Sequence, residues 1–189
     1  MRINEIFCSI QGEGYFTGTP SVFIRTSGCN LQCSFCDTSH ASGEDMTIDE
    51  IVASAASYPP RHVVVTGGEP SLQSELPQLV DSLHKEGFFV QIETNGTRPL
   101  PVSIDWVTCS PKQLSKTLIL HPHELKVVYQ AQEMTPYEQL FDAQVYCLQP
   151  CDTGDARLNG SLLRGVIDYV LSHPRWRLSL QTHKLIGVR

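Results

Sequence analysis

Three cysteines close together define the most specific chemistry in this sequence. Cys29, Cys33 and Cys36 form a C-x₃-C-x₂-C pattern in the polar stretch SGCNLQCSFCDTSH at 27–40. A closed tetrahedral metal site needs four ligands, and His40 follows at a spacing that could complete a Cys₃His zinc site. Three thiolates can instead hold a 4Fe-4S cluster and leave one iron open to an outside ligand. An accidental group of buried cysteines is the third alternative, although so polar a stretch is a poor place to bury thiols.

The size and charge of the chain indicate one domain that acts on a small molecule. Its 189 residues, 41% hydrophobic and 18% charged, can bury a core of their own, so we expect a single domain over 1–189. The formal net charge of −6 provides no basic surface for nucleic acid and no polybasic patch for a membrane. A small molecule is therefore the favoured partner.

Cysteine usage and the lack of targeting signals predict a cytoplasmic protein. The N-terminal stretch MRINEIFCSIQGEG shows no signal segment, and no apolar run approaches the ~20 residues of a membrane span. Seven cysteines, with three crowded together, suit a reduced compartment and a metal or cluster better than a disulfide framework. The remaining cysteines are expected to be buried and inert: Cys8, Cys109, Cys147 and Cys151.

The elements that must position the cysteines are short strands alternating with a few helices. Helical patterns fall at 47–57, where Thr47 and Glu50 make a capping box, at 72–86 and at 161–173. Strands buried on both faces and joined by crossovers indicate a parallel sheet. We therefore expect an α/β fold, a partial (open) TIM-like barrel of about six parallel strands. Apolar, β-rich runs predict these strands at 21–26, 62–66, 89–93, 105–109, 124–128 and 145–148, with a last one at 177–180.

The unusual residues gather where these strands end. In parallel barrels the active site lies at the C-terminal ends of the strands. Loops there are commonly rich in glycine and proline, which explains the glycines but not three cysteines at the same edge. The strands lead into SGC at 27–29, GGEP at 67–70, TNGT at 94–97, SPK at 110–112 and QPCD at 149–152.

The cysteine loop and TGGEP at 66–70 together resemble the radical S-adenosylmethionine (SAM) superfamily. In that superfamily the amino and carboxylate groups of SAM bind the open iron. A narrower resemblance runs along nearly the whole chain, to the 7-carboxy-7-deazaguanine synthase family. It implies ring contraction of 6-carboxy-5,6,7,8-tetrahydropterin to 7-carboxy-7-deazaguanine with loss of ammonia, on the route to queuosine. The motifs that carry it are SIQGEG, VFIRTSGCNLQCSFCDT, ETNG, CSPK, LQP and QTHK.

The resemblance assigns the cofactor residues. Cys29, Cys33 and Cys36 hold the cluster, and Thr38 binds Mg²⁺, which prefers hard oxygen ligands. Glu69 is able to accept a hydrogen bond from the SAM ammonium group, or to pair with a lysine at the edge of the barrel. The residues implicated in SAM binding are Phe35, Asp37, Gly68, Glu69, Ser110, Pro111, Lys112, Gln149, Pro150, Cys151 and Asp152.

The resemblance also assigns the pterin site. The guanidinium fork of Arg25 suits a carboxylated substrate, although an arginine at a strand end often just extends into water. The carboxylate of Arg189 is expected to accept hydrogen bonds from the pterin, against the alternative of a frayed end. The full set is Ile10, Gln11, Gly12, Arg25, Thr66 and Arg189, with Glu93 and His183 as weaker candidates.

The resemblance further implies an external electron donor, flavodoxin, and a homodimer. One electron reduces the cluster, and a 5′-deoxyadenosyl radical from SAM takes hydrogen from C6 of the pterin before SAM is regenerated. Two other functions stay open at this point. One is a small radical SAM activase that acts on a protein, as glycyl-radical activases do. The other is a zinc-binding module without catalysis.

Overall fold

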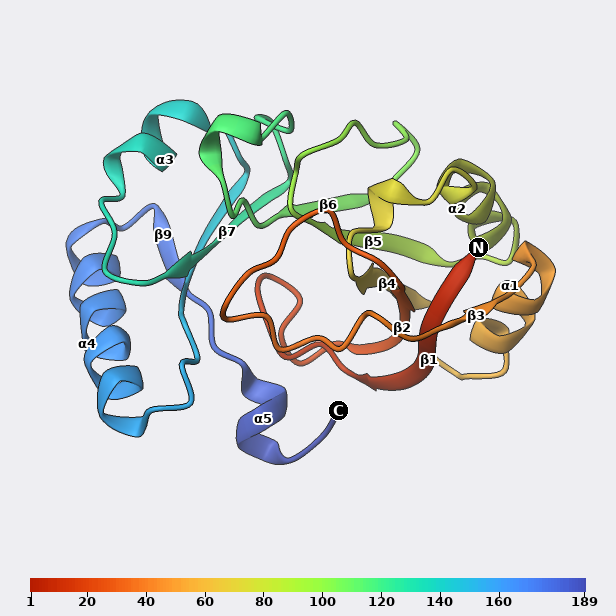
Figure 1. Ribbon diagram of the computed structural model, residues 1–189, viewed down its shortest axis with the longest axis horizontal. Coiled ribbons are helices and arrows are strands. Elements are labelled where there is room, and N and C mark those ends of the chain that lie inside the picture. Colours follow the sequence, from red (N-terminus) through yellow and green to blue (C-terminus); the bar gives the residue numbers. More distant parts are fainter.

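The computed structural model describes residues 1–189 and is built on one curved, nine-stranded sheet (Figure 1). The strand order is β3-β1-β2-β4-β5-β6-β7-β8-β9. From β2 to β9 along the sheet every pair of neighbours is parallel, whereas β1 is antiparallel to β2 and β3. The sheet does not close, so the expected partial TIM-like barrel is confirmed. The strands are β1 Arg2–Ile10, β2 Pro20–Thr26, β3 Glu44–Asp45, β4 His62–Gly67, β5 Phe89–Thr94, β6 Trp106–Cys109, β7 Glu124–Tyr129, β8 Val145–Pro150 and β9 Trp176–Leu178.

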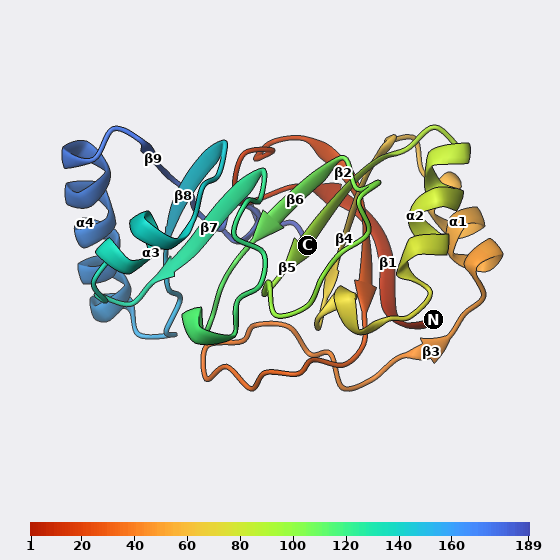
Figure 2. The same ribbon diagram turned by 90° about the horizontal axis from the view of Figure 1, so that it is seen from above.

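Helices cover the outer face of the sheet in two groups. Figure 2 shows α1 and α2 against one end of the sheet and α3 and α4 against the other. Each group buries its own apolar core, one against β2, β4 and β5 and one against β7, β8 and β9. No helix is long and apolar enough to cross a membrane. The helices are α1 Ile48–Ala56, α2 Leu76–Lys85, α3 Thr135–Leu140, α4 Ala156–Ser172 and α5 Thr182–Ile186, with 3₁₀ turns η1 Pro70–Leu72 and η2 Leu114–Lys116.

Capping side chains decide where the helices begin. The capping box before α1 is present, with Thr47 and Glu50 bonded reciprocally. The predicted helix at 72–86 starts only at Leu76, because residues 70–72 form a separate 3₁₀ turn capped by Glu69. The predicted helix at 161–173 starts earlier, at Ala156, because the Asp155 carboxylate accepts hydrogen bonds from the first-turn amides.

Four elements have no counterpart among the predictions: β1, β3, α3 and α5. A register shift between Ile3 and Glu5 breaks the alternation of β1, which makes that strand hard to recognise. Cys8 on this strand is exposed, so its predicted burial is wrong, whereas Cys109, Cys147 and Cys151 are buried as expected. The last predicted strand, at 177–180, is shorter and ends at Leu178.

The concave face of the barrel is polar, although the strands read as apolar runs. In β7, Leu125 and Val127 lie in the apolar core outside the barrel. Their neighbours Glu124 and Lys126 point the other way, because successive side chains of a strand alternate between its faces. Both charged side chains are nevertheless buried. The barrel interior therefore presents buried charged side chains that suit a charged ligand.

The loop at 11–19 fills the end of the barrel opposite the cysteines. The amide of Gly14 donates to Ser179 Oγ at 2.9 Å, and the amide of Tyr15 donates to Glu124 Oε1 at 3.2 Å. The Tyr15 ring stacks on Trp106 with centroids 4.9 Å apart. Gly14 has φ of 67°, and a Cβ there would overlap the Glu124 carboxylate. This loop thus forms a floor beneath the site.

Candidate active site

Two adjoining cavities occupy the C-terminal ends of the parallel strands. The first contains all three cysteines of the C-x₃-C-x₂-C loop, and the second extends to the last residues of the chain. Each cavity draws its walls from several strands, so no single motif forms either one. Because they share side chains, a ligand in one cavity lies next to a ligand in the other. The shared residues are Glu13, Asp37, Thr38, Thr66 and Glu93.

The cysteine loop suits an iron–sulfur cluster. Cys29, Cys33 and Cys36 are free thiols on the wall of the first cavity. The amide of Leu31 lies 3.4 Å from Cys29 Sγ, and hydrogen bonds to sulfur stabilise a cluster thiolate. Burial raises the pKa of Cys33, so a positive metal centre is needed to keep that thiolate deprotonated. No three His, Cys, Asp or Glu side chains lie close enough to hold one metal ion, so the three thiols would have to move together on binding either zinc or a cluster.

The TGGEP segment holds the cysteine loop in place. The amide of Gly68 donates to the Thr26 carbonyl at 2.9 Å, and the amide of Glu69 donates to the Gly28 carbonyl at 2.8 Å. A Cβ on Gly68 would overlap the Gly28 carbonyl, so only glycine permits this approach. Gly68 also lines the first cavity. One glycine therefore serves both the backbone contact and the predicted SAM surface.

Glu69 has a different position from the one that the SAM hypothesis requires. Its side chain is fully buried and does not line the cavity. The carboxylate accepts hydrogen bonds at 2.7 Å from both Thr94 Oγ1 and the Asn95 amide, and at 2.6 Å from Ser71 Oγ. It also makes no ion pair with Lys112, whose ammonium donates to Ser110 Oγ at 2.6 Å. Glu69 therefore links the segment after β4 to the end of β5 through buried hydrogen bonds.

The other predicted SAM residues, apart from Pro111, all line the first cavity. The Lys112 ammonium lies over the Phe35 ring, 5.8 Å from its centroid, and burial lowers the pKa of that lysine. Asp37 and Asp152 face the same cavity, and both carboxylates contact Lys184. The hydrogen bond from Lys184 is the main reason that the pKa of Asp152 falls to about 2. This cavity therefore combines thiols, an aromatic ring and charges of both signs.

All eight predicted pterin residues line the second cavity. Arg25 does not extend into water, because its Nε lies 3.1 Å from Glu5 Oε1 and its Nη1 donates to Thr38 Oγ1 at 3.3 Å. Gly12 packs so closely on His183 that a Cβ there would overlap it. Ser9 Oγ donates to the main-chain oxygen of Arg189 at 2.6 Å, which holds that residue at the cavity.

Two charged cavity residues were missed by the sequence-based predictions: Glu13, which both cavities share, and Lys126, which lines the first. The Lys126 ammonium, only 5% exposed, lies 2.5 Å from Glu13 Oε2 and 3.4 Å from Glu93 Oε1. Burial is the largest single influence on Glu13 and would raise its pKa, but the charge and hydrogen bond of Lys126, together with the hydrogen bond from Gln181, outweigh it and bring that pKa to about 2. The same carboxylates raise the pKa of Lys126 against its own burial. The sequence feature that could have identified Lys126 is its position inside the predicted buried strand ELKVV at 124–128.

Such a cysteine loop at the strand ends of an open α/β barrel defines a radical SAM protein, and residues 23–116 match the model of the radical SAM superfamily. The chain is 57% identical over 188 residues to 7-carboxy-7-deazaguanine synthase of Bacteroides thetaiotaomicron, covering 100% of this chain and 98% of that protein. It is 37% identical to the enzyme of that name from Haemophilus influenzae, covering 99% and 93%. The chain belongs to the 7-carboxy-7-deazaguanine synthase family.

Solved structures agree with this assignment. The crystal structure of QueE from Escherichia coli superposes with a TM-score of 0.73 at 32% identity, covering 96% of this chain and 94% of that one. Membership of the radical SAM superfamily implies a 4Fe-4S cluster and SAM as cofactors. The cavity suits both cofactors: its three free thiols can hold the cluster, and its charged side chains and the Phe35 ring can contact SAM.

Proposed function

We propose that this chain converts 6-carboxy-5,6,7,8-tetrahydropterin to 7-carboxy-7-deazaguanine by radical ring contraction with loss of ammonia, in queuosine and related deazapurine biosynthesis. One observation carries the proposal: the cavity with the cysteines and the cavity with the predicted pterin residues share five wall residues. Groups held in the first cavity would therefore lie directly beside a substrate held in the second. The names of the full-length relatives support the same reaction.

The side chains of this protein bind, orient and enclose the reactants. Cys29, Cys33 and Cys36 would hold the cluster, which with SAM supplies one-electron reduction and radical chemistry. Arg25 forms an ion pair with Glu5 and lines the second cavity, where its guanidinium N–H groups are available to the pterin carboxylate. Glu93, beside Lys126 and Thr66, presents an acceptor to ring N–H groups. The loop at 11–19 covers the end of the barrel opposite the cysteines and would exclude water from that side.

The decisive experiment is anaerobic reconstitution of the full chain. Protein with iron, sulfide, SAM, reductant, Mg²⁺ and the carboxypterin should yield 7-carboxy-7-deazaguanine and ammonia in equal amounts, detected by mass spectrometry. Protein that binds zinc and no cluster would contradict the proposal. A loaded cluster that cleaves SAM but leaves the pterin unchanged would favour the activase alternative. Flavodoxin is our proposed physiological donor and a homodimer our proposed assembly, both on the family resemblance alone.

We also propose Mg²⁺ at Thr38. Its hydroxyl faces both cavities, and the Glu93 carboxylate lines the same walls, so hard oxygen ligands are available. The Arg25 guanidinium now donates to that hydroxyl, so binding the ion requires Arg25 to give up this bond. Thr38→Ala should bind SAM within about twofold of wild type but lose magnesium stimulation and most activity, because the ion orients the substrate. Unchanged activity and unchanged Mg²⁺ dependence would contradict the assignment.

The terminal carboxylate gives another expected result. Arg189 lines the pterin cavity, and its guanidinium contacts Glu5 and lies 4.5 Å from the Phe7 ring centroid. Residues appended after Arg189 should raise the KM for the pterin about tenfold, because the carboxylate is moved or converted to an amide. Cluster content and SAM affinity should stay unchanged. A tag of the same length before Met1 is the control, and equal kcat/KM for the two tagged proteins would refute the role.

A further inference from the structure

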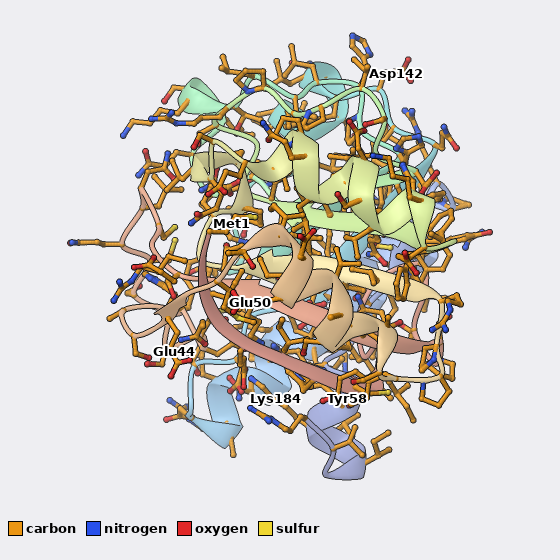
Figure 3. All side chains as sticks on the ribbon, turned by 90° about the vertical axis from the view of Figure 1, so that its right-hand side faces the viewer. Met1, Glu44, Glu50, Tyr58, Asp142 and Lys184 are labelled. Atoms are coloured by element: carbon orange, nitrogen blue, oxygen red, sulfur yellow. The ribbon has the colours of Figure 1, made fainter.

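We propose that Lys184 is a positioning residue that couples the two cavities, so that pterin binding strengthens SAM binding and the reverse. The inference rests on the proposed function for the identity of the two ligands. Lys184 belongs to the QTHK segment, to which the proposed chemistry assigns only His183. In Figure 3 it lies near α5, at the lower edge of the molecule.

The Lys184 ammonium donates hydrogen bonds to Asp152 and Gln181 and forms an ion pair with Asp37. It lies 3.1 Å from Asp37 Oδ2, 2.9 Å from Asp152 Oδ2 and 2.8 Å from Gln181 Oε1. Asp37 belongs to the cysteine loop, Asp152 follows β8, and both line the first cavity. One side chain therefore joins two segments whose residues are expected to contact SAM.

Gln181 adds a second link from the same segment. Its Nε2 donates to Asp37 Oδ2 at 2.9 Å and to Glu13 Oε1 at 3.0 Å. Three loops that come from β1, β2 and β8 thus meet at the start of α5.

The same segment also lines the pterin cavity. His183 packs on Gly12, and the Thr182 amide donates to the Gly12 carbonyl at 2.9 Å. His183, Lys184 and Arg189 all line the second cavity. A pterin that contacts this segment therefore holds α5 in the position in which Lys184 reaches both aspartates.

These ion pairs contribute more to geometry than to stability. The side chains of Lys184, Asp37 and Asp152 are 38%, 53% and 42% exposed, and pairs this exposed stabilise a fold only weakly. The ion pairs instead fix the position of the cysteine loop relative to the loop after β8, and both loops line the cavity expected to bind SAM. Because coupling between binding sites is reciprocal, each ligand should change the affinity of the other by the same factor.

The test measures ligand binding without turnover. Cluster-loaded protein, kept without reductant, is titrated with SAM in the absence and presence of saturating carboxypterin, and with the pterin in the absence and presence of SAM. We expect the pterin to lower the SAM Kd of the wild type at least about fivefold, with the same factor in the reverse titration. In Lys184→Met both factors should fall to about one, with cluster content and the urea midpoint unchanged.

Two further variants separate positioning from a general effect of charge. Lys184→Arg, which can still reach both carboxylates, should keep most of the coupling. Lys116→Met removes an exposed lysine of η2 and should behave as wild type. Wild-type protein without coupling, or Lys184→Met with full coupling, would overturn the inference. Wild-type protein that forms no deazaguanine once reductant is added contradicts the proposed function instead, so the two failures are distinguishable.

Discussion

Replacing Cys33 by alanine should abolish both the 4Fe-4S cluster and the conversion of the pterin. The C-x₃-C-x₂-C loop offers three thiols to one cavity, and two are too few to hold a cluster in a partly open site. Iron and sulfide per chain and the visible absorbance should fall to background in anaerobically reconstituted protein. Product formation, followed by mass spectrometry, should fall with them.

The matched control for this change is Cys8→Ala. Cys8 is an exposed thiol on β1, outside both cavities, so its removal should leave iron content and activity as in wild type. The cluster-free Cys33→Ala protein should also unfold at the same urea concentration as cluster-free wild type. The Cys33 side chain is only partly buried and lies in a loop on the cavity wall, outside the apolar cores. A Cys33→Ala protein with full iron content and activity would disprove the cluster assignment.

Replacing Lys126 by methionine should destabilise the folded chain severely. Removing one partner of a buried ion pair leaves an uncompensated charge, and here Glu13 and Glu93 both lose the same ammonium. We expect the free energy of unfolding of the cluster-free protein to fall by about 3–5 kcal/mol at pH 7. Urea titration followed by circular dichroism measures this loss directly.

The pH dependence of stability should change in sign with this substitution. In the wild type the pKa of Glu13 is about 2 when folded, against an ordinary 4.5. Its stabilising contribution is therefore complete above pH 4.5 and is lost as the pH falls toward 2. Without Lys126, burial raises the pKa of Glu13, so protonation near pH 4.5 should stabilise the variant. Urea midpoints measured from pH 7 down to about pH 3 should rise for the variant as the pH approaches 4.5, whereas those of the wild type should hold to pH 4.5 and then fall.

Adding Glu13→Gln provides the control for Lys126→Met. A neutral amide carries no charge to leave unpaired, so the double variant should recover a substantial part of the lost stability. The exposed Lys85, in the last turn of α2, gives a matched substitution that should cost almost nothing. If Lys126→Met loses less than about 1 kcal/mol, or keeps the pH slope of the wild type, the buried ion network has no such role.

The sequence by itself determined the chemistry of the cysteine loop and most of the parallel sheet. Three cysteines at fixed spacing restrict the cofactor, because ligand number and type follow from local sequence. The runs at 62–66 and 124–128 form β4 and β7. Strands of a parallel sheet are covered on both faces, so they are recognisable as short, mainly apolar runs. The strand-end loops then had to gather at one edge, because parallel strands all end on the same side.

Tertiary structure decided what no short stretch encodes. Lys126 pairs with Glu13 across 113 residues, and Lys184 contacts Asp152, 32 residues earlier, as well as Asp37, more than a hundred residues earlier. Glu69 belongs to a motif that indicates cofactor contact, yet the fold turns its carboxylate inward to Thr94 and Asn95. A charged group's role depends on which charges and amides the closed chain brings to it. Those partners exist only once the sheet has curved into a barrel.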